Sequence, residues 1–338
     1  ELDRLHSLGL TAAHIVPEKG ILKGNSDLII LDNDFNSLSK NIAQVIEFKT
    51  SNWSDRTYPN SLLGVIALLR QTFMDAQWYM QANQIIEEFP EMNEPIFKNL
   101  SLESLEDNIT SQKPVLFITK EEHGVVRSLN LSKEFDLNPW ILSNGYEYRR
   151  LVEIKDHKPF IISPLNFPGK PKVSNPYDAM QYSTEQLQHW DMVPDNLKKI
   201  YDAGLRFGLT TSMMKNKRDF RKNLQRMVDR GLSKDVLLAA LTTFPAEAMG
   251  VEKHVGKIQP GFIANLVVTD GDYFDPNSRV TSVWVSGEEK YLFPKFKFEI
   301  LGKWELSFNN KVIDFEFLIE NNKDKLNYGK TKGIFEDK

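Results

Sequence analysis

The sequence predicts an α/β fold built on a parallel sheet, and two observations carry this prediction. Short apolar runs at residues 114–119, 140–143 and 160–163 have the continuous hydrophobic character of strands that are buried on both faces. Between these runs, residues 121–135 and 146–155 carry apolar side chains at helical spacing. Strands that alternate with helices in this way are joined by right-handed crossovers, so they are expected to be parallel.

The residues before this region extend the pattern. Residues 9–16 and 26–31 are predicted strands, and residues 44–50 are a further candidate strand. Ser61 is the predicted N-cap of a long helix with an apolar stripe, and Pro90 ends that helix.

The residues after the third strand begin with a long irregular segment. Residues 164–183 are rich in Pro, Gly and Asn and are predicted to form a loop, and loops of this length inside a compact domain are usually functional. A helix at residues 196–203, a strand at 206–211 and a basic helix at 218–230 are predicted next. Ser233 is the predicted N-cap of the helix that follows.

From residue 250 onward, the alternation of strands and helices gives way to strands alone. Residues 262–269 and 280–286 are predicted strands with no helix between them. The predicted division is an α/β domain at residues 1–249, a small β module at 250–294, an additional β segment at 295–320 and a charged linker at 321–338.

Composition excludes several classes of function. The absence of cysteine excludes disulfides, thiolate metal sites and a cysteine nucleophile. With 42 Lys and Arg against 46 Asp and Glu, the net charge of −4 gives no electrostatic case for nucleic acid as a partner. The longest apolar stretch, residues 62–69, is far shorter than the roughly 18 residues that a membrane span requires, so we expect no transmembrane span.

Two segments resemble the C-terminal signature of the amidohydrolase superfamily, and most closely its imidazolonepropionase-like branch. They are residues 240–250, which end in Phe-Pro-Ala-Glu-Ala-Met-Gly, and residues 256–268. Residues 283–287 resemble the returning strand of the family's accessory β-sandwich. The resemblance implies a (β/α)8 amidohydrolase-type barrel, incomplete at its N-terminus, plus part of a small β-sandwich. It places the family's first strand, with its His-x-His pair, before residue 1.

Further segments resemble one half of large two-barrel amidohydrolase-related proteins of Bacteroidetes. They are Gly24-Asn-Ser, residues 58–64 and residues 69–79. In those proteins one barrel is degenerate and the other keeps its metal ligands. The resemblance implies a multidomain parent that hydrolyses carbon–nitrogen bonds other than peptide bonds. It also implies a periplasmic or outer-membrane-associated location, with the remaining segments or the second barrel of the parent as partners; a cytoplasmic location stays open.

The positions that hold metal ligands in this family carry hydroxyl side chains here. The family places a His after strand 5, a His after strand 6 and an Asp after strand 8. The matching positions are Thr119, Ser143, and either Thr211 or Ser212. Neutral hydroxyls are weak ligands for zinc. The resemblance therefore implies zinc or another divalent metal in the family, but neither a metal nor another cofactor in this segment.

Three other residues are candidates for catalysis or ligation. No two of the six histidines lie within four residues of each other, so there is no His-x-His motif. His14 lies at the end of a predicted strand, His123 begins the helix after residues 114–119, and Glu47 lies on a predicted strand. The simpler interpretations are that His14 is a structural histidine, His123 an exposed histidine and Glu47 a solvated carboxylate. The histidines predicted to lie in loops are His157, His189 and His254.

Four basic residues are candidates for contact with an anionic ligand. Lys215 and Lys217 follow the predicted strand at 206–211, and Arg149 and Arg150 follow the one at 140–143. In a (β/α) barrel, loops after strands lie on the face that carries the site.

We therefore expect an amidohydrolase-related domain of a larger hydrolase, with this barrel catalytically degenerate and in a structural or ligand-binding role. One alternative is an active metal-dependent amidohydrolase whose ligands come from upstream of residue 1. Another is a cell-envelope binding or scaffold subunit that contacts protein partners through residues 164–183.

Overall fold

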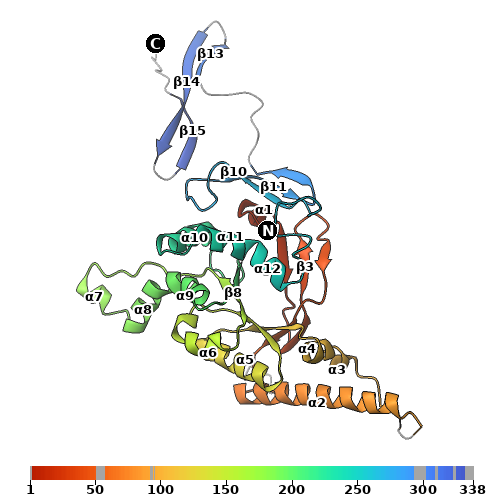
Figure 1. The fold of residues 1–338 in the computed structure, drawn as a ribbon. Coiled ribbons are helices and arrows are strands. Elements are labelled where there is room, and N and C mark those ends of the chain that lie inside the picture. The colour runs from red at the N-terminus through yellow and green to blue at the C-terminus, as the bar shows by residue number, and fades with distance from the viewer. Residues whose placement is uncertain are drawn as a thin grey trace.

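The centre of the structure is a six-stranded sheet with the strand order β2-β5-β6-β7-β8-β9 (Figure 1). The computed structural model describes residues 2–50, 58–91, 94, 96–292, 302–308, 311–322 and 325–331. The strands of this sheet are β2 (Leu22–Asn25), β5 (Gln44–Glu47), β6 (Pro114–Ile118), β7 (Asn138–Leu142), β8 (Phe160–Pro164) and β9 (Phe207–Thr210). Neighbouring strands from β5 to β9 are parallel, and β2 is antiparallel to β5.

Both faces of the sheet are apolar, as the continuous hydrophobic runs predict. One set of side chains lies in register across the strands and packs into the larger core: Ile46, Phe117, Ile141, Ile161 and Phe207. The set at the alternate positions packs into a second core on the opposite face: Val45, Leu116, Trp140 and Phe160. Successive side chains of a strand point to opposite faces, which is why one strand contributes to both cores.

Helices cover the face that carries the larger core. They include α2 (Leu62–Glu88), α5 (Glu122–Glu134), α6 (Leu151–Lys155), α9 (Asn196–Asp202), α10 (Asp219–Asp229) and α11 (Lys234–Leu241). The predicted caps are confirmed, because Ser61 accepts a hydrogen bond from the Gly64 N–H and Ser233 accepts one from the Asp235 N–H. Short helices complete this part: α1 (Leu2–Ser7), α3 (Leu100–Glu103), α4 (Glu106–Thr110) and α12 (Thr243–Ala248).

A small antiparallel sheet covers the opposite face. Its strands are β1 (Ala12–Ile15), β3 (Asp27–Ile30) and β4 (Ser37–Ser39), in the order β1-β3-β4. Leu28 of β3 and Val251, which follows α12, pack in the same core as Leu116 and Trp140. The parallel pairing from β5 to β9 confirms the predicted parallel α/β sheet. Among the described residues, the edge strands β2 and β9 do not pair with each other, so an eight-stranded barrel stays a prediction.

A second three-stranded antiparallel sheet consists of β10 (Leu266–Thr269), β11 (Val280–Val285) and β12 (Glu288–Tyr291). Val280, Val283 and Val285 pack against Ile30 of β3, so the N-terminal residues share the core of this β module. Strand β12 is absent from the sequence-based prediction. It forms because Ser286 and Gly287 both adopt positive φ, which makes the tight two-residue turn of a hairpin.

The third antiparallel sheet contains β13 (Gly302–Phe308), β14 (Lys311–Asn322) and β15 (Lys325–Thr331). The additional β segment predicted at residues 295–320 contains β13 and most of β14, and residues 295–301 and 309–310 lie outside the described part. Residues 325–331, inside the predicted linker at 321–338, form β15, which pairs with β14 through main-chain hydrogen bonds that require no apolar side chain. Residues 332–338 are outside the described part.

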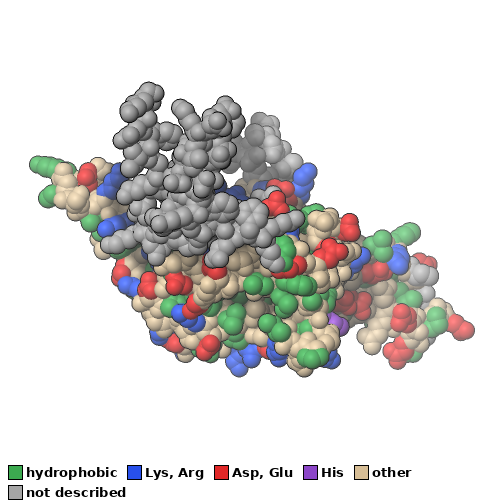
Figure 2. All heavy atoms as spheres, turned by 90° about the horizontal axis from the view of Figure 1, so that it is seen from above, with side chains coloured by type: hydrophobic (Ala, Val, Ile, Leu, Met, Phe, Trp, Pro, Cys, Tyr) green, Lys and Arg blue, Asp and Glu red, His purple; other side chains and the backbone are tan. Residues whose placement is uncertain are grey.

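The surface charges and the apolar character of the helices are those expected from a chain with a small net charge and short apolar stretches. On the face seen in Figure 2, Lys and Arg side chains are interspersed with Asp and Glu, without a large area of one sign outside the grey atoms. No helix in the described ranges combines the length and the apolar character that a membrane span requires.

Candidate functional site

The carboxyl ends of β5 to β9 meet at one edge of the sheet, where parallel α/β folds carry their sites. Thr119 directly follows β6, and its Oγ1 donates a hydrogen bond of 2.8 Å to the Leu142 carbonyl. Ser143 directly follows β7, and its Oγ accepts a hydrogen bond of 3.2 Å from the Gly145 N–H. Both side chains are buried, with 1% and 0% exposure. These hydroxyls therefore bind the backbone that surrounds them.

The third predicted ligand position is more open. Thr211 is half-buried and Ser212 is exposed, and the Ser212 N–H donates to Oγ1 of Thr210, the last residue of β9. Divalent metals of the zinc type require imidazole nitrogens or carboxylates, and these positions supply neutral hydroxyls. Within the described ranges, no group of three or more His, Asp or Glu side chains is placed to hold a metal ion. The residues present at this edge do not fit a zinc centre.

Glu47, at the end of β5, is held between two lysines. Its Oε2 lies 2.7 Å from the Lys23 Nζ, and its Oε1 lies 2.8 Å from the Lys120 Nζ. Burial favours the neutral acid, but hydrogen bonds from Lys120 and Lys23 hold the pKa of Glu47 below its usual value. Since both carboxylate oxygens have cationic partners, the arrangement stabilises the end of β5.

His14, on β1, lies against Trp140 of the second core. Its Nε2 is 2.7 Å from the Ser26 Oγ, and its ring meets that of Trp140 edge-on at a centroid separation of 6.0 Å. Burial lowers the pKa of His14 to about 4, against a weaker opposing effect of the Asp27 charge. The ring is therefore neutral at pH 7. His123, in contrast, is exposed on α5, with Nε2 3.8 Å from the Glu122 carboxylate.

Arg149 and Arg150 already have carboxylate partners. Arg149, in the short 3-10 helix η1 (Glu147–Arg149), lies 2.8 Å from Glu185 and 3.4 Å from Glu122. Arg150 lies 3.7 Å from Glu122 and 3.3 Å from Glu153. The hydrogen bond with Glu185 raises the pKa of Arg149 above its usual value. These pairs leave both guanidinium groups largely neutralised, which weakens them as contacts for an anionic ligand.

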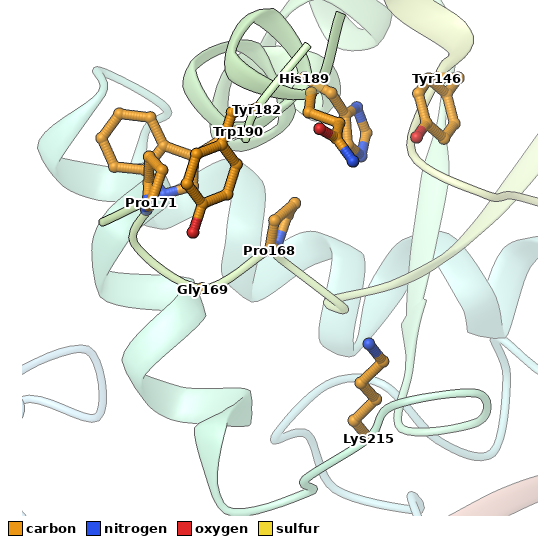
Figure 3. A pocket seen from close by; sticks show the side chains of 9 residues that line it. Tyr146, Pro168, Gly169, Pro171, Tyr182, His189, Trp190 and Lys215 are labelled. Atoms are coloured by element: carbon orange, nitrogen blue, oxygen red, sulfur yellow. The ribbon is translucent and has the colours of Figure 1, made fainter. Parts of the chain in front are cut away.

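Lys215 lines an open pocket of about 350 Å³ near the carboxyl ends of the parallel strands (Figure 3). Loops after three neighbouring strands contribute to its wall. Tyr146 follows β7, Pro168 and Pro171 follow β8, and Lys215 follows β9. The remaining wall comes from the segment around α8 (Thr184–Met192) and contains Tyr182, Gln186, His189 and Trp190. Lys217 is not part of this wall.

His189 lines this pocket, and the prediction that it lies in a loop is wrong. It lies in α8 and not in a loop, because Ser183 and Gln186 form a capping box that starts this helix. The helical turn α7 (Pro176–Ala179) also interrupts the predicted loop at residues 164–183. The Ser-x-x-Gln spacing was the signal in the sequence that could have located α8.

The His189 ring stacks on Tyr146, with centroids 3.8 Å apart and planes inclined by 12°. Its Nδ1 lies 3.5 Å from the Tyr148 hydroxyl, and the Arg149 guanidinium lies 4.9 Å from the Tyr146 centroid. Burial, followed by the charge of Arg149, lowers the pKa of His189. A side chain at Gly145, where φ is +88°, would approach Val193 to 3.3 Å, so the turn before Tyr146 favours glycine.

Comparison with known proteins supports an amidohydrolase-type fold. Residues 194–293 match the profile of the amidohydrolase family. The amidohydrolase tasK of Hapsidospora irregularis is 29% identical over 115 residues, which are 34% of this chain and 11% of that protein. The matched segment thus spans about a tenth of this curated relative. The crystal structure of an amidohydrolase from Thermotoga maritima MSB8 is similar with a TM-score of 0.69 at 19% identity, over 86% of this chain and 74% of that one.

Proposed function

We propose that this chain, which has the fold of an amidohydrolase, is one domain of a larger hydrolase that acts on carbon–nitrogen bonds other than peptide bonds. We further propose that the domain is catalytically degenerate and holds no catalytic metal, so that its own role is structural or ligand-binding. The family profile at residues 194–293 and the structural likeness support the first part. The hydroxyl side chains at the strand ends support the second.

The observation that carries this proposal is the bonding of Thr119 and Ser143. Both side chains are buried and both bond to the backbone. An ion placed there would replace these bonds with contacts to neutral hydroxyls, which are weak ligands. The carboxylate of Glu47, at the end of a neighbouring strand, is engaged by Lys23 and Lys120. Coordination by Glu47 would require the loss of at least one of these ion pairs.

Metal content tests the proposal. The purified chain is loaded with zinc chloride, freed of unbound metal by gel filtration and measured by elemental mass spectrometry. We expect far less than one zinc per chain. The His123→Ala variant is the matched control for non-specific zinc, because His123 is exposed and neutral imidazole is a common metal ligand. One zinc per chain that survives gel filtration in both proteins would contradict the proposal and favour an active metal-dependent amidohydrolase.

We propose further segments or a second barrel of the parent protein as partners of this domain. In the described residues, β2 and β9 are the two edges of the six-stranded sheet and are not joined to each other. Unpaired edges are templates for additional strands. Hydrogen exchange tests this point: the amides of Phe207–Thr210 should exchange more slowly in the parent protein than in this chain. Equal exchange rates would remove the support for a partner at β9.

The finer assignments have sequence resemblance as their support. These are the imidazolonepropionase-like branch, a two-barrel parent of the Bacteroidetes type, and a periplasmic or outer-membrane-associated location. Fractionation of cells that express the parent protein tests the location, which would be wrong if the protein remained with the cytoplasmic fraction.

A further inference from the structure

The pocket beside α8 has flat aromatic walls. The stacked pair of Tyr146 and His189 forms one wall, and Tyr182 and Trp190 lie across from it with Pro168 between them (Figure 3). Its volume of about 350 Å³ falls within the range of small-molecule sites, which is roughly 300–1,000 Å³. Aromatic side chains favour other planar rings by stacked or edge-on contact. The shape and the walls of the pocket therefore fit a planar ligand.

The charge in this pocket is positive. The Lys215 side chain points into it, and no Asp or Glu contributes to the wall (Figure 3). In the described part of the chain, no carboxylate lies within ion-pair distance of Lys215. Glu185, on the same helix as His189, is engaged by Arg149 at 2.8 Å. The ammonium group of Lys215 is thus available to an anion.

Two further groups are available for hydrogen bonds to a ligand. His189 is nine-tenths buried and its Nδ1 faces Tyr148, while its Nε2 has no partner among the described residues. The lowered pKa of His189 keeps this ring neutral at pH 7, so that Nε2 donates or accepts one hydrogen bond. The Tyr182 hydroxyl accepts from the Lys172 N–H and retains its own proton as a donor.

We propose that this pocket binds a small planar organic anion, an aromatic or heteroaromatic carboxylate, with the carboxylate on Lys215 and the ring between the aromatic walls. Lysine supplies the charge, and the tyrosine and histidine side chains supply stacking surface and hydrogen bonds. Binding of this kind requires no metal. The inference deepens the ligand-binding role of the proposed function, on which it rests, and it is tested by a measurement other than metal content.

Calorimetric titration with matched probes tests the inference. The probes are 2-naphthoate, its neutral analogue 2-naphthamide, and acetate, which carries the charge without the ring. We expect 2-naphthoate to bind more tightly than about 1 mM, and to bind at least about fivefold more tightly than either of the other probes. Failure of 2-naphthoate to bind, or equal affinity for 2-naphthoate and 2-naphthamide, would overturn the proposal.

Three variants locate the binding to this pocket. Lys215→Gln should weaken 2-naphthoate by about fivefold and leave 2-naphthamide unchanged, because only the ion pair is lost. Lys215→Arg should retain most of the affinity, since it keeps the charge. Lys222→Gln removes the same charge from the exposed side of α10 and should change nothing. Equal effects of Lys215→Gln and Lys222→Gln would refute binding at Lys215, and thermal melting confirms that each variant is folded.

Discussion

Replacement of Glu47 by glutamine should lower the free energy of unfolding by about 3 kcal/mol. This is the lower end of the cost of removing one partner of a buried ion pair. The Glu47 side chain is 10% exposed and the Lys23 side chain is 5% exposed, whereas the Lys120 side chain is 69% exposed. Without the carboxylate charge, the buried Lys23 ammonium has only neutral acceptors, which are the Glu18 carbonyl at 2.6 Å and the amide oxygen of the new glutamine. The cost arises mainly from this buried charge and not from Lys120.

Comparison of the two lysines separates the buried contact from the exposed one. Lys120→Gln should cost less than about 1 kcal/mol, because solvent screens an exposed ion pair. The double variant Glu47→Met with Lys23→Met should recover most of the stability that Glu47→Gln loses, because apolar residues of similar volume leave no uncompensated charge. Urea unfolding followed by tryptophan fluorescence gives the free energy of unfolding of each variant.

The effect of Glu47 should also depend on pH. Its native-state pKa is lowered, so the ion pair contributes its full stabilisation above the unfolded-state pKa of about 4.3. The contribution is lost as the pH falls through the lowered native-state pKa, so the wild type and Glu47→Gln should converge in acid. The reasoning would be refuted if the free energy of unfolding of Glu47→Gln were within about 0.5 kcal/mol of the wild-type value at neutral pH. It would also be refuted if Lys120→Gln lowered this free energy as much as Lys23→Gln.

Two further predictions concern His14 and α8. Because burial lowers the pKa of His14 to about 4, its unfolded state binds a proton first, and the chain should lose stability as the pH falls from about 6.5 towards 4. His14→Gln should reduce this dependence, and an NMR titration in which the His14 ring protonates near pH 6.5 would contradict the assignment. Ser183→Ala removes the capping box of α8 and should cost about 1 kcal/mol in the unfolding free energy. It should also weaken 2-naphthoate binding by loosening His189, whereas unchanged unfolding and binding would show that the cap does not position this residue.

The local pattern of apolar and capping residues was sufficient to predict most of the helices and strands. Apolar runs predicted β6, β7 and β8 because a parallel strand is buried on both faces, and the cap residues Ser61 and Ser233 predicted two helix starts. The hydroxyl side chains of Thr119 and Ser143 could be placed at strand ends for the same reason. Strand β12 could not be predicted in this way, since it depends on two consecutive positive-φ residues and has little apolar character.

The tertiary structure alone decided which polar groups meet. Glu47 meets Lys23 and Lys120, which are 24 residues before it and 73 after it, and these two contacts turn a candidate catalytic carboxylate into a buried ion pair. Tyr146, His189 and Lys215 form one pocket although they belong to different loops and helices. The physical reason is that hydrophobic periodicity depends on residues that are close in the sequence, so the sequence alone reveals it. Charge pairing and stacking depend on distance in space, and they can join any groups that the fold brings within a few ångströms.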